Sequence, residues 1–147
     1  MLRYRTVVIL IFSLTAVLAC GKKEWPSPIV KEEVFSLQVE NATRVRDCLQ
    51  VQARVSGRAD NLSAVVLEAE DIGKEAACPT CPFQATQSFT LSRNSAQMDI
   101  LGDILHLQVC GLDLDSDYRF RILGKNIHSQ INDAETRVFS PEKKRKE

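Results

Sequence analysis

The chain has 147 residues, which is room for one ordinary domain, and its 19 basic and 19 acidic residues cancel at pH 7. An apolar fraction of 44% and a charged fraction of 26% are typical of a globular protein. Six glycines and five prolines are too few for a disordered, low-complexity chain. The balanced charge excludes the basic excess that nucleic-acid binding requires, so we expect no nucleic-acid partner.

Residues 1–19 have the composition of an export signal. Arg3 and Arg5 precede an apolar run over residues 7–19, which ends in the small residue Ala19. This run has 13 residues, whereas a helix that spans a membrane needs roughly 20. We therefore expect a cleaved signal peptide rather than a retained anchor helix. Its removal leaves 19 − 2 = 17 basic against 19 acidic residues, again without a basic excess.

The signal ends in Val17-Leu18-Ala19-Cys20-Gly21, which resembles the lipobox of bacterial lipoproteins. The resemblance implies cleavage before Cys20, a thioether-linked diacylglyceride on its sulfur and an acyl chain such as palmitate on its new amino group. Two or more such chains hold a protein stably on a membrane. By analogy with enteric bacteria, Gly21 in place of Asp implies the outer membrane, facing the periplasm. An ordinary signal peptide with a coincidental cysteine is the alternative.

Residues 20–33 are predicted to form a lipid-anchored linker. The segment is polar, contains Pro26 and Pro28, and shows no hydrophobic periodicity. Such a composition is typical of a semi-extended spacer, which would hold the following domain away from the lipid headgroups.

From residue 34 onward, apolar and polar residues alternate with period two, as in half-buried strands. Seven segments have this pattern: residues 34–39, 49–55, 65–69, 83–91, 105–109, 118–122 and 136–138. Turn-forming residues separate them, and no segment keeps a helical period. We therefore expect an antiparallel β-sandwich over residues 34–140. Residues 141–147 are predicted to be a charged, frayed tail.

The stretch from Leu112 to Asn126 resembles the E–F corner and F strand of fibronectin type III domains. In that family a Leu and a few turn residues precede a Tyr, alternating apolar residues, a small residue and Asn; here these are Leu112, Tyr118, Gly124 and Asn126. The resemblance implies a fibronectin type III or immunoglobulin-like sandwich of about seven strands. It also implies that Tyr118 forms a tyrosine corner, with its hydroxyl bonded to upstream backbone, and that Leu112 plugs the core. The sequence departs from the family at Ala53, where the family has a core Trp.

Four cysteines remain beside Cys20, namely Cys48, Cys78, Cys81 and Cys110. An even number in an exported chain favours disulfides, and four cysteines allow three pairings. In the fibronectin-type sandwich, strands B and E are antiparallel neighbours. Cys48 begins strand B and Cys110 ends strand E, each out of phase with the apolar positions. The resemblance therefore implies a Cys48–Cys110 disulfide on the outer face, which leaves Cys78–Cys81 as the second pair.

Cys78-Pro79-Thr80-Cys81-Pro82 is a CxxC motif in a predicted loop between two strands. A structural disulfide is the favoured interpretation, because the βαβ context of thioredoxin-like redox motifs is missing. A redox site is one alternative. A metal site is another, with Cys48 and Cys110 or the two histidines as further ligands.

Two other groups of residues were considered as sites. Asp113, Asp115 and Asp117 suggest a calcium loop, but the sixth and twelfth positions lack the Gly and Glu of an EF-hand. His106 and His128 have no partner in the sequence for catalysis or metal binding. We expect all five to be solvated surface residues, and we expect no catalytic residue, metal or cofactor.

The sequence therefore predicts a lipoprotein, held on the membrane by lipid on Cys20, with a non-catalytic binding or structural β-sandwich. Such domains work through their surfaces, so an envelope protein is the expected partner. The alternative is a redox or metal-handling lipoprotein that uses Cys78 and Cys81.

Overall fold

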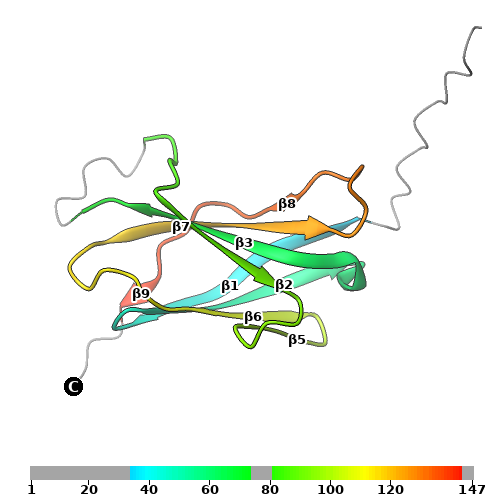
Figure 1. The fold of residues 1–147 in the computed structure, drawn as a ribbon, viewed down its shortest axis with the longest axis horizontal. Helices are drawn as coiled ribbons and strands as arrows, with labels where there is room; N and C mark the ends of the chain where they lie inside the picture. The colour runs from blue at the N-terminus through cyan, green and yellow to red at the C-terminus, as the bar shows by residue number, and fades with distance from the viewer. Residues whose placement is uncertain (1–33, 74–80, 144–147) are drawn as a thin grey trace, which may run out of the picture.

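The computed structural model describes residues 34–73 and 81–143 (Figure 1). Within these residues the chain is all-β, with nine strands and one short 3₁₀-helix. In chain order the elements are β1 (Phe35–Val45), β2 (Cys48–Gly57), η3 (Ala59–Asn61), β3 (Leu62–Asp71), β4 (Gln87–Ser92), β5 (Met98–Leu101), β6 (Ile104–Val109), β7 (Tyr118–Asn126), β8 (Ala134–Glu135) and β9 (Glu142–Lys143). The predicted signal peptide, the predicted linker and residues 144–147 lie outside the described residues.

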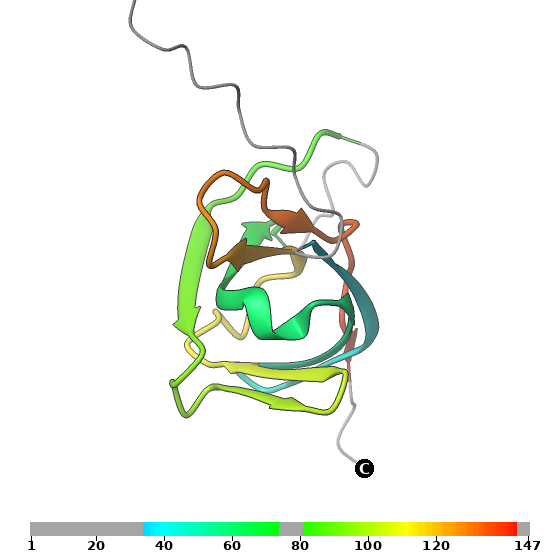
Figure 2. The ribbon, with the colours of Figure 1, turned by 90° about the vertical axis from the view of Figure 1, so that its right-hand side faces the viewer.

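The strands form two sheets that face each other, as the end-on view in Figure 2 shows. One sheet has the strand order β5-β6-β2-β1-β9 and the other has the order β4-β3-β7-β8. Neighbouring strands are antiparallel except β9, which pairs in parallel with β1 at Thr43 and Arg44. The predicted β-sandwich is therefore confirmed.

The observed strands differ from the predicted segments in several places, and β1 and β3 are also longer than predicted. The fourth strand starts at Gln87, so residues 83–86 are not part of it. The predicted strand at residues 136–138 is instead irregular chain that follows β8. Strands β5 and β9 were not predicted, because their four and two residues are too short to show a period.

A β-bulge in β1 changes which side chains of this strand face the core. Phe35 and Leu37 point inward, but the register with β2 shifts between Val39 and Asn41. After the shift the inward positions are Ala42 and Arg44. A bulge adds one residue to a strand and so reverses the phase of the alternation that follows it. The bulge therefore turns the charged Arg44 toward the interior.

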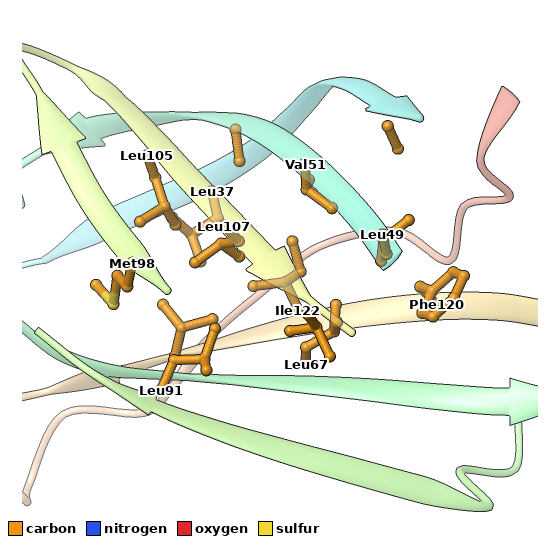
Figure 3. Close-up of a cluster of buried hydrophobic side chains, with 14 of the residues drawn as sticks. Leu37, Leu49, Val51, Leu67, Leu91, Met98, Leu105, Leu107, Phe120 and Ile122 are labelled. Atoms are coloured by element: carbon orange, nitrogen blue, oxygen red, sulfur yellow. The ribbon is translucent and has the colours of Figure 1, made fainter. Parts of the chain in front are cut away.

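Aliphatic side chains from both sheets fill the space between them (Figure 3). The largest fully buried side chains are Phe120, Leu49, Leu62, Leu67, Leu105, Ile122, Val51 and Val65. Ala53, where the fibronectin family has a Trp, is also fully buried. Phe120 stacks on Tyr118 and on Phe139, with ring centroids 5.8 and 5.9 Å apart. These aromatic rings therefore lie on β7 and on the chain after β8, whereas the core Trp of the fibronectin family would lie on β2.

Gly124 on β7 allows the two sheets to approach closely at the first strand. A Cβ atom at this position would lie 2.8 Å from side-chain carbons of both Phe35 and Leu37. Such contacts are shorter than packed carbon atoms tolerate. The small residue therefore makes room for the first two core side chains of β1.

Candidate functional site

The turns of the sandwich gather at two opposite ends (Figure 1). We call the first the linker end, because β1 starts there after residue 33. It also contains η3, the turn at residues 102–103 and the loop at residues 127–133. Three backbone hydrogen bonds tie its segments together: Arg58 N–H to Val34 O (3.3 Å), Ile127 N–H to Asn61 O (2.8 Å) and Val55 N–H to Asp103 O (2.8 Å).

We call the second the corner end. It contains the turn between β1 and β2, the end of β3, residues 110–117 and the last described residues. Backbone bonds connect its turns, since Leu112 N–H donates to Asp47 O (3.0 Å) and Ile72 N–H donates to Asp117 O (2.9 Å). Segments that are far apart in the sequence therefore meet at this end.

Tyr118 fixes the turn of residues 112–117 by a hydrogen bond from its buried position. Its side chain is buried, and its hydroxyl oxygen accepts a hydrogen bond of 3.2 Å from the backbone N–H of Asp113. Leu112 is also buried in the core. A buried tyrosine ring whose hydroxyl is bonded five residues upstream has the geometry of a tyrosine corner.

Arg44 lies over the Tyr118 ring and holds the same turn. Its residue is only 6% exposed, and its guanidinium donates to three backbone carbonyls: Arg46 O at 3.0 Å, Ser116 O at 2.5 Å and Asp113 O. Its Cζ also lies 5.3 Å from the centroid of the Tyr118 ring, within cation–π range. Because these partly buried hydrogen bonds reach both ends of residues 113–116, Arg44 fixes the path of this turn.

Sequence reasoning missed Arg44, although a signal was present. The inward-facing residues of β1 are Leu37 and Val39 in its first half and Ala42 and Arg44 in its second half, so the strict alternation is broken between Val39 and Ala42. Such a break indicates a bulge. The sequence alone does not show where a buried arginine would find acceptors, because two of the three carbonyls lie far along the chain, at separations of 72 and 69 residues.

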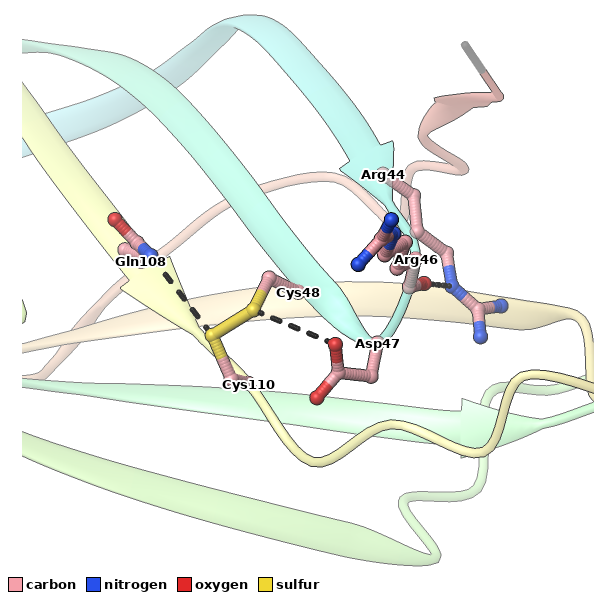
Figure 4. Close-up of a disulfide and its surroundings, with 6 residues drawn as sticks. All are labelled: Arg44, Arg46, Asp47, Cys48, Gln108 and Cys110. Carbon is pink, nitrogen blue, oxygen red and sulfur yellow. Dashed lines mark hydrogen bonds between the residues drawn. A yellow bond between two sulfur atoms is a disulfide. The ribbon is translucent and has the colours of Figure 1, made fainter. Parts of the chain in front are cut away.

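The Cys48–Cys110 disulfide also lies at the corner end (Figure 4). Leu49 pairs with Val109 across β2 and β6, so the cysteines are the next pair along the ladder. The sulfur atoms are 2.00 Å apart, which confirms the predicted bridge. Gln108 Nε2 lies 3.8 Å from the Cys110 sulfur. The bridge joins the two strands outside the core, because the cysteines are out of phase with the buried residues.

An ion pair lies on the outer face of the second sheet, near the corner end. Arg119 on β7 donates to one carboxylate oxygen of Glu70 on β3, at 2.6 Å from Nη2 and 3.0 Å from Nε. The two side chains are only 10% and 13% exposed. Arg119 also donates to the backbone carbonyl of Cys81, at 3.2 Å from Nη1. The pair therefore holds the chain after the CxxC motif against the sheet.

A second arginine extends this contact. Arg121 pairs with Glu68 on β3 (2.6 Å) and Glu135 on β8 (2.7 Å), and its Cζ lies 4.9 Å from the centroid of the Phe83 ring. The hydrogen bond to Glu68 is the largest of the effects that raise the pKa of Arg121 above its ordinary value. The sequence carried a signal for both pairs, because Glu68 and Glu70 alternate with apolar residues on β3 as the two arginines do on β7.

The structure describes only one cysteine of the CxxC motif. Cys81 is disulfide-bonded, and its partner lies outside the described residues. The Cys78–Cys81 bridge therefore stays a prediction, as does the lipid on Cys20, which also lies outside them. In residues 34–73 and 81–143 there is no group of three metal-binding side chains.

The other residues singled out from the sequence lie on the surface. His106 lies opposite Gln52 and Asp99 in the first sheet and lines a surface cavity of about 230 Å³. The backbone N–H of His128 donates to the side chain of Asn126 within the loop after β7. The corner aspartates form a local turn contact, because Asp115 N–H donates to Asp113 Oδ1 (2.9 Å).

A groove of about 600 Å³ runs between the first half of β1 and the irregular chain after β8. Residues 36–39 line one side and residues 135–139 line the other. The chain after β8 is held on β7 instead, since Phe139 and Phe120 exchange two backbone hydrogen bonds and Thr136 N–H donates to Ile122 O. This groove separates the edges of the two sheets.

No protein-family model matches this chain, and no curated protein is significantly similar to it in sequence. Among the residues that the structure describes, no helix is long and apolar enough to cross a membrane. The fold and its disulfide define a two-layer β-sandwich domain, which is consistent with a non-catalytic structural role.

Proposed function

We propose that this chain is a bacterial lipoprotein whose β-sandwich is a non-catalytic binding module of the cell envelope. The lipobox-like sequence that ends in Cys20 supports the anchor and an outer-membrane location that faces the periplasm. The domain binds an envelope protein through its corner end, which lies opposite the start of β1.

The observation that carries the binding proposal is the pre-ordered corner end. Arg44, Tyr118 and the disulfide at Cys48 each fix its turns. A surface that is already ordered loses little conformational entropy when a partner binds. This surface is therefore suited to recognition by shape rather than to catalysis.

The chemistry of the corner end indicates the kind of partner it fits. Leu114 is 68% exposed and stands between Asp113 and Asp115, with Asp117 in the same turn. An aliphatic contact with carboxylates around it matches a partner that offers an apolar depression with a basic rim. Such charges steer the approach, and the apolar contact supplies binding energy.

The anchor is tested by Cys20→Ala and labelling with an alkyne fatty acid in growing cells. We expect the parent chain to carry the label and to sediment with membranes, and the variant to lose both properties. A variant that remains processed and membrane-bound would contradict the lipid anchor. The fractions should be read by immunoblot against a known envelope lipoprotein.

The binding face is tested by a photocrosslinking amino acid placed at Leu114 in intact cells. Ile127, which is 55% exposed at the linker end, is the matched control position. We expect a discrete crosslinked protein from position 114 and none from position 127. The same band from both positions, or a band from position 127 alone, would contradict a partner site at the corner end.

The alternative function is thiol–disulfide exchange at Cys78 and Cys81. Arg119 approaches Cys81 at its carbonyl and is already paired with Glu70, so it adds little positive potential near the sulfur. Equilibration of the purified protein in glutathione buffers separates the two functions. A Cys78–Cys81 disulfide with a reduction potential well below that of the periplasm supports a structural role. A disulfide whose potential lies near that of the periplasm supports thiol–disulfide exchange.

A further inference from the structure

The linker end exposes aliphatic side chains at the tips of its turns. Leu101, at the end of β5, is 63% exposed, and Ile127, directly after β7, is 55% exposed. Val34, where the described chain begins, is 40% exposed. Single exposed apolar residues need no explanation. Here three of them belong to the linker end, whereas the corner end exposes Leu114 and Val45.

The backbone bonds described above place these tips together. Val34 is bonded to Arg58 and Ile127 to Asn61, while the turn after Leu101 is bonded to Val55 near the end of β2. Figure 2 looks directly onto this end, with the loop after β7, η3 and the turn between β5 and β6 facing the viewer. The tips therefore belong to the same face.

The charges of the linker end are compensated. Its turn carboxylates are each paired with a base: Asp60 with Arg93 (3.6 Å), Asp103 with Arg54, and Asp133 with Lys125. Among the described residues no carboxylate pairs with Arg58. Leu114 at the corner end is 68% exposed, slightly more than Leu101, but it stands in a turn with three aspartates. Because these turn carboxylates are paired, bringing the linker end to an anionic bilayer surface carries little electrostatic cost.

We propose that the linker end is a lipid-docking surface, on which Leu101 and Ile127 enter the interface of a phospholipid bilayer. This inference rests on the proposed anchor at Cys20. Residues 20–33 span at most about 50 Å when fully extended, so the tether holds this end near the bilayer. At the resulting effective concentration, contacts that are too weak to bind a free domain become occupied.

Docking would fix the orientation of the domain. With the linker end on the lipid, the corner end points away from the membrane, toward the partner proposed above. Because β1 runs from one end to the other and is 11 residues long, the corner end would stand about 35 Å above the lipid surface.

The test uses the lipidated full chain in vesicles of phosphatidylcholine and phosphatidylglycerol with brominated acyl chains. Trp25, the only tryptophan, is replaced by Phe, and a new fluorophore is introduced by Leu101→Trp, Ile127→Trp or Leu114→Trp. We expect bromine to quench the first two variants about threefold more strongly than the third, because only they reach the acyl region. Equal quenching at all three positions, or stronger quenching at position 114, would overturn the proposal.

A second arm examines whether the two tips act together. Adding Ile127→Asp to the Leu101→Trp variant should remove most of the quenching, and adding Leu114→Asp should leave it unchanged. Quenching that survives Ile127→Asp would count against a shared docking face.

The experiment separates this inference from the anchor itself. If the full chain carries no lipid and does not float with vesicles, the proposed anchor fails. The same quenching comparison is then made on a chain that begins at Gly21 behind a histidine tag, held by a nickel-chelating lipid. Quenching confined to positions 101 and 127 supports lipid docking in that case too, and its absence overturns it.

Discussion

At the corner end, the turns are held by a buried guanidinium, a buried tyrosine and a disulfide. At the linker end, they are held by backbone hydrogen bonds, by the half-exposed Arg93, which donates to Asp60 O (2.7 Å), and by ion pairs whose side chains are 37% to 85% exposed. Buried polar contacts are costly to break because water does not replace them, whereas exposed ion pairs contribute little. We therefore expect the corner end to keep one fixed shape and the linker end to tolerate substitution.

The largest effect is expected at the disulfide. Replacing both Cys48 and Cys110 by Ala opens a bridge between residues separated by 62 positions. In the chain-entropy model this lowers the free energy of unfolding by about 4 kcal/mol. Guanidinium unfolding in non-reducing buffer measures the loss. A double variant as stable as the parent chain would show that the bridge does not stabilise the corner end.

The next effect is expected at Arg44. Arg44→Met keeps most of the apolar packing but removes the donors for three backbone carbonyls. We expect a loss of about 3 kcal/mol, because such acceptors stay partly buried without partners. Urea unfolding measures it.

The matched control for this variant is Arg58→Met at the linker end, which should change stability by less than about 0.5 kcal/mol. Similar losses in the two variants would remove the proposed difference between the ends. Hydrogen exchange should also show faster opening of residues 112–117 in Arg44→Met alone.

A smaller effect is expected at the ion pair on the second sheet. Glu70→Gln removes the carboxylate that Arg119 contacts on β3, and we expect a loss of about 2 kcal/mol, below the value for fully buried pairs because both side chains keep some exposure. A double-mutant cycle with Arg119→Met isolates the coupling by urea unfolding. If Glu40→Gln, at the exposed partner of Arg54, costs as much, the burial argument is wrong.

The smallest effect is expected at the linker end. Asp60 and Arg93 are 3.6 Å apart, with side chains 85% and 41% exposed. A double-mutant cycle of Asp60→Ala and Arg93→Ala should give a coupling below about 0.5 kcal/mol, and added salt should reduce it further. A large coupling that is insensitive to salt would mean that this end is locked as well.

The strands of the sandwich were predictable because, in a two-layer fold, each strand has one buried and one exposed face, so apolar and polar residues alternate along it. Residues 49–55 alternate strictly, and β2 has that burial pattern. The Cys48–Cys110 bridge followed because both cysteines are out of phase with the buried positions of adjacent strands. The strands were predicted from local sequence patterns, and the disulfide was predicted from the strand pairing that the fold class implies.

The parts that were not predicted depend on contacts between distant residues. Arg44 is buried because a bulge turns it inward, and two of its three acceptors lie on the turn before β7. The predicted strand at residues 136–138 does not form because Ile122 N–H donates to the Thr136 hydroxyl instead of to a backbone carbonyl, and backbone pairing with β7 resumes only at Phe139. No periodicity in a single segment reports such partners.

The direction of β1 has a mechanical consequence. A partner that pulls on the corner end, against a tether at Val34, loads the β1–β2 ladder along the strand axis. Its hydrogen bonds lie perpendicular to the strands, so they resist this tension together as a shear joint instead of opening one after another. The Cys48–Cys110 bond carries the load onward from β2 into β6. With the proposed anchor and partner in place, the domain would transmit force along its length.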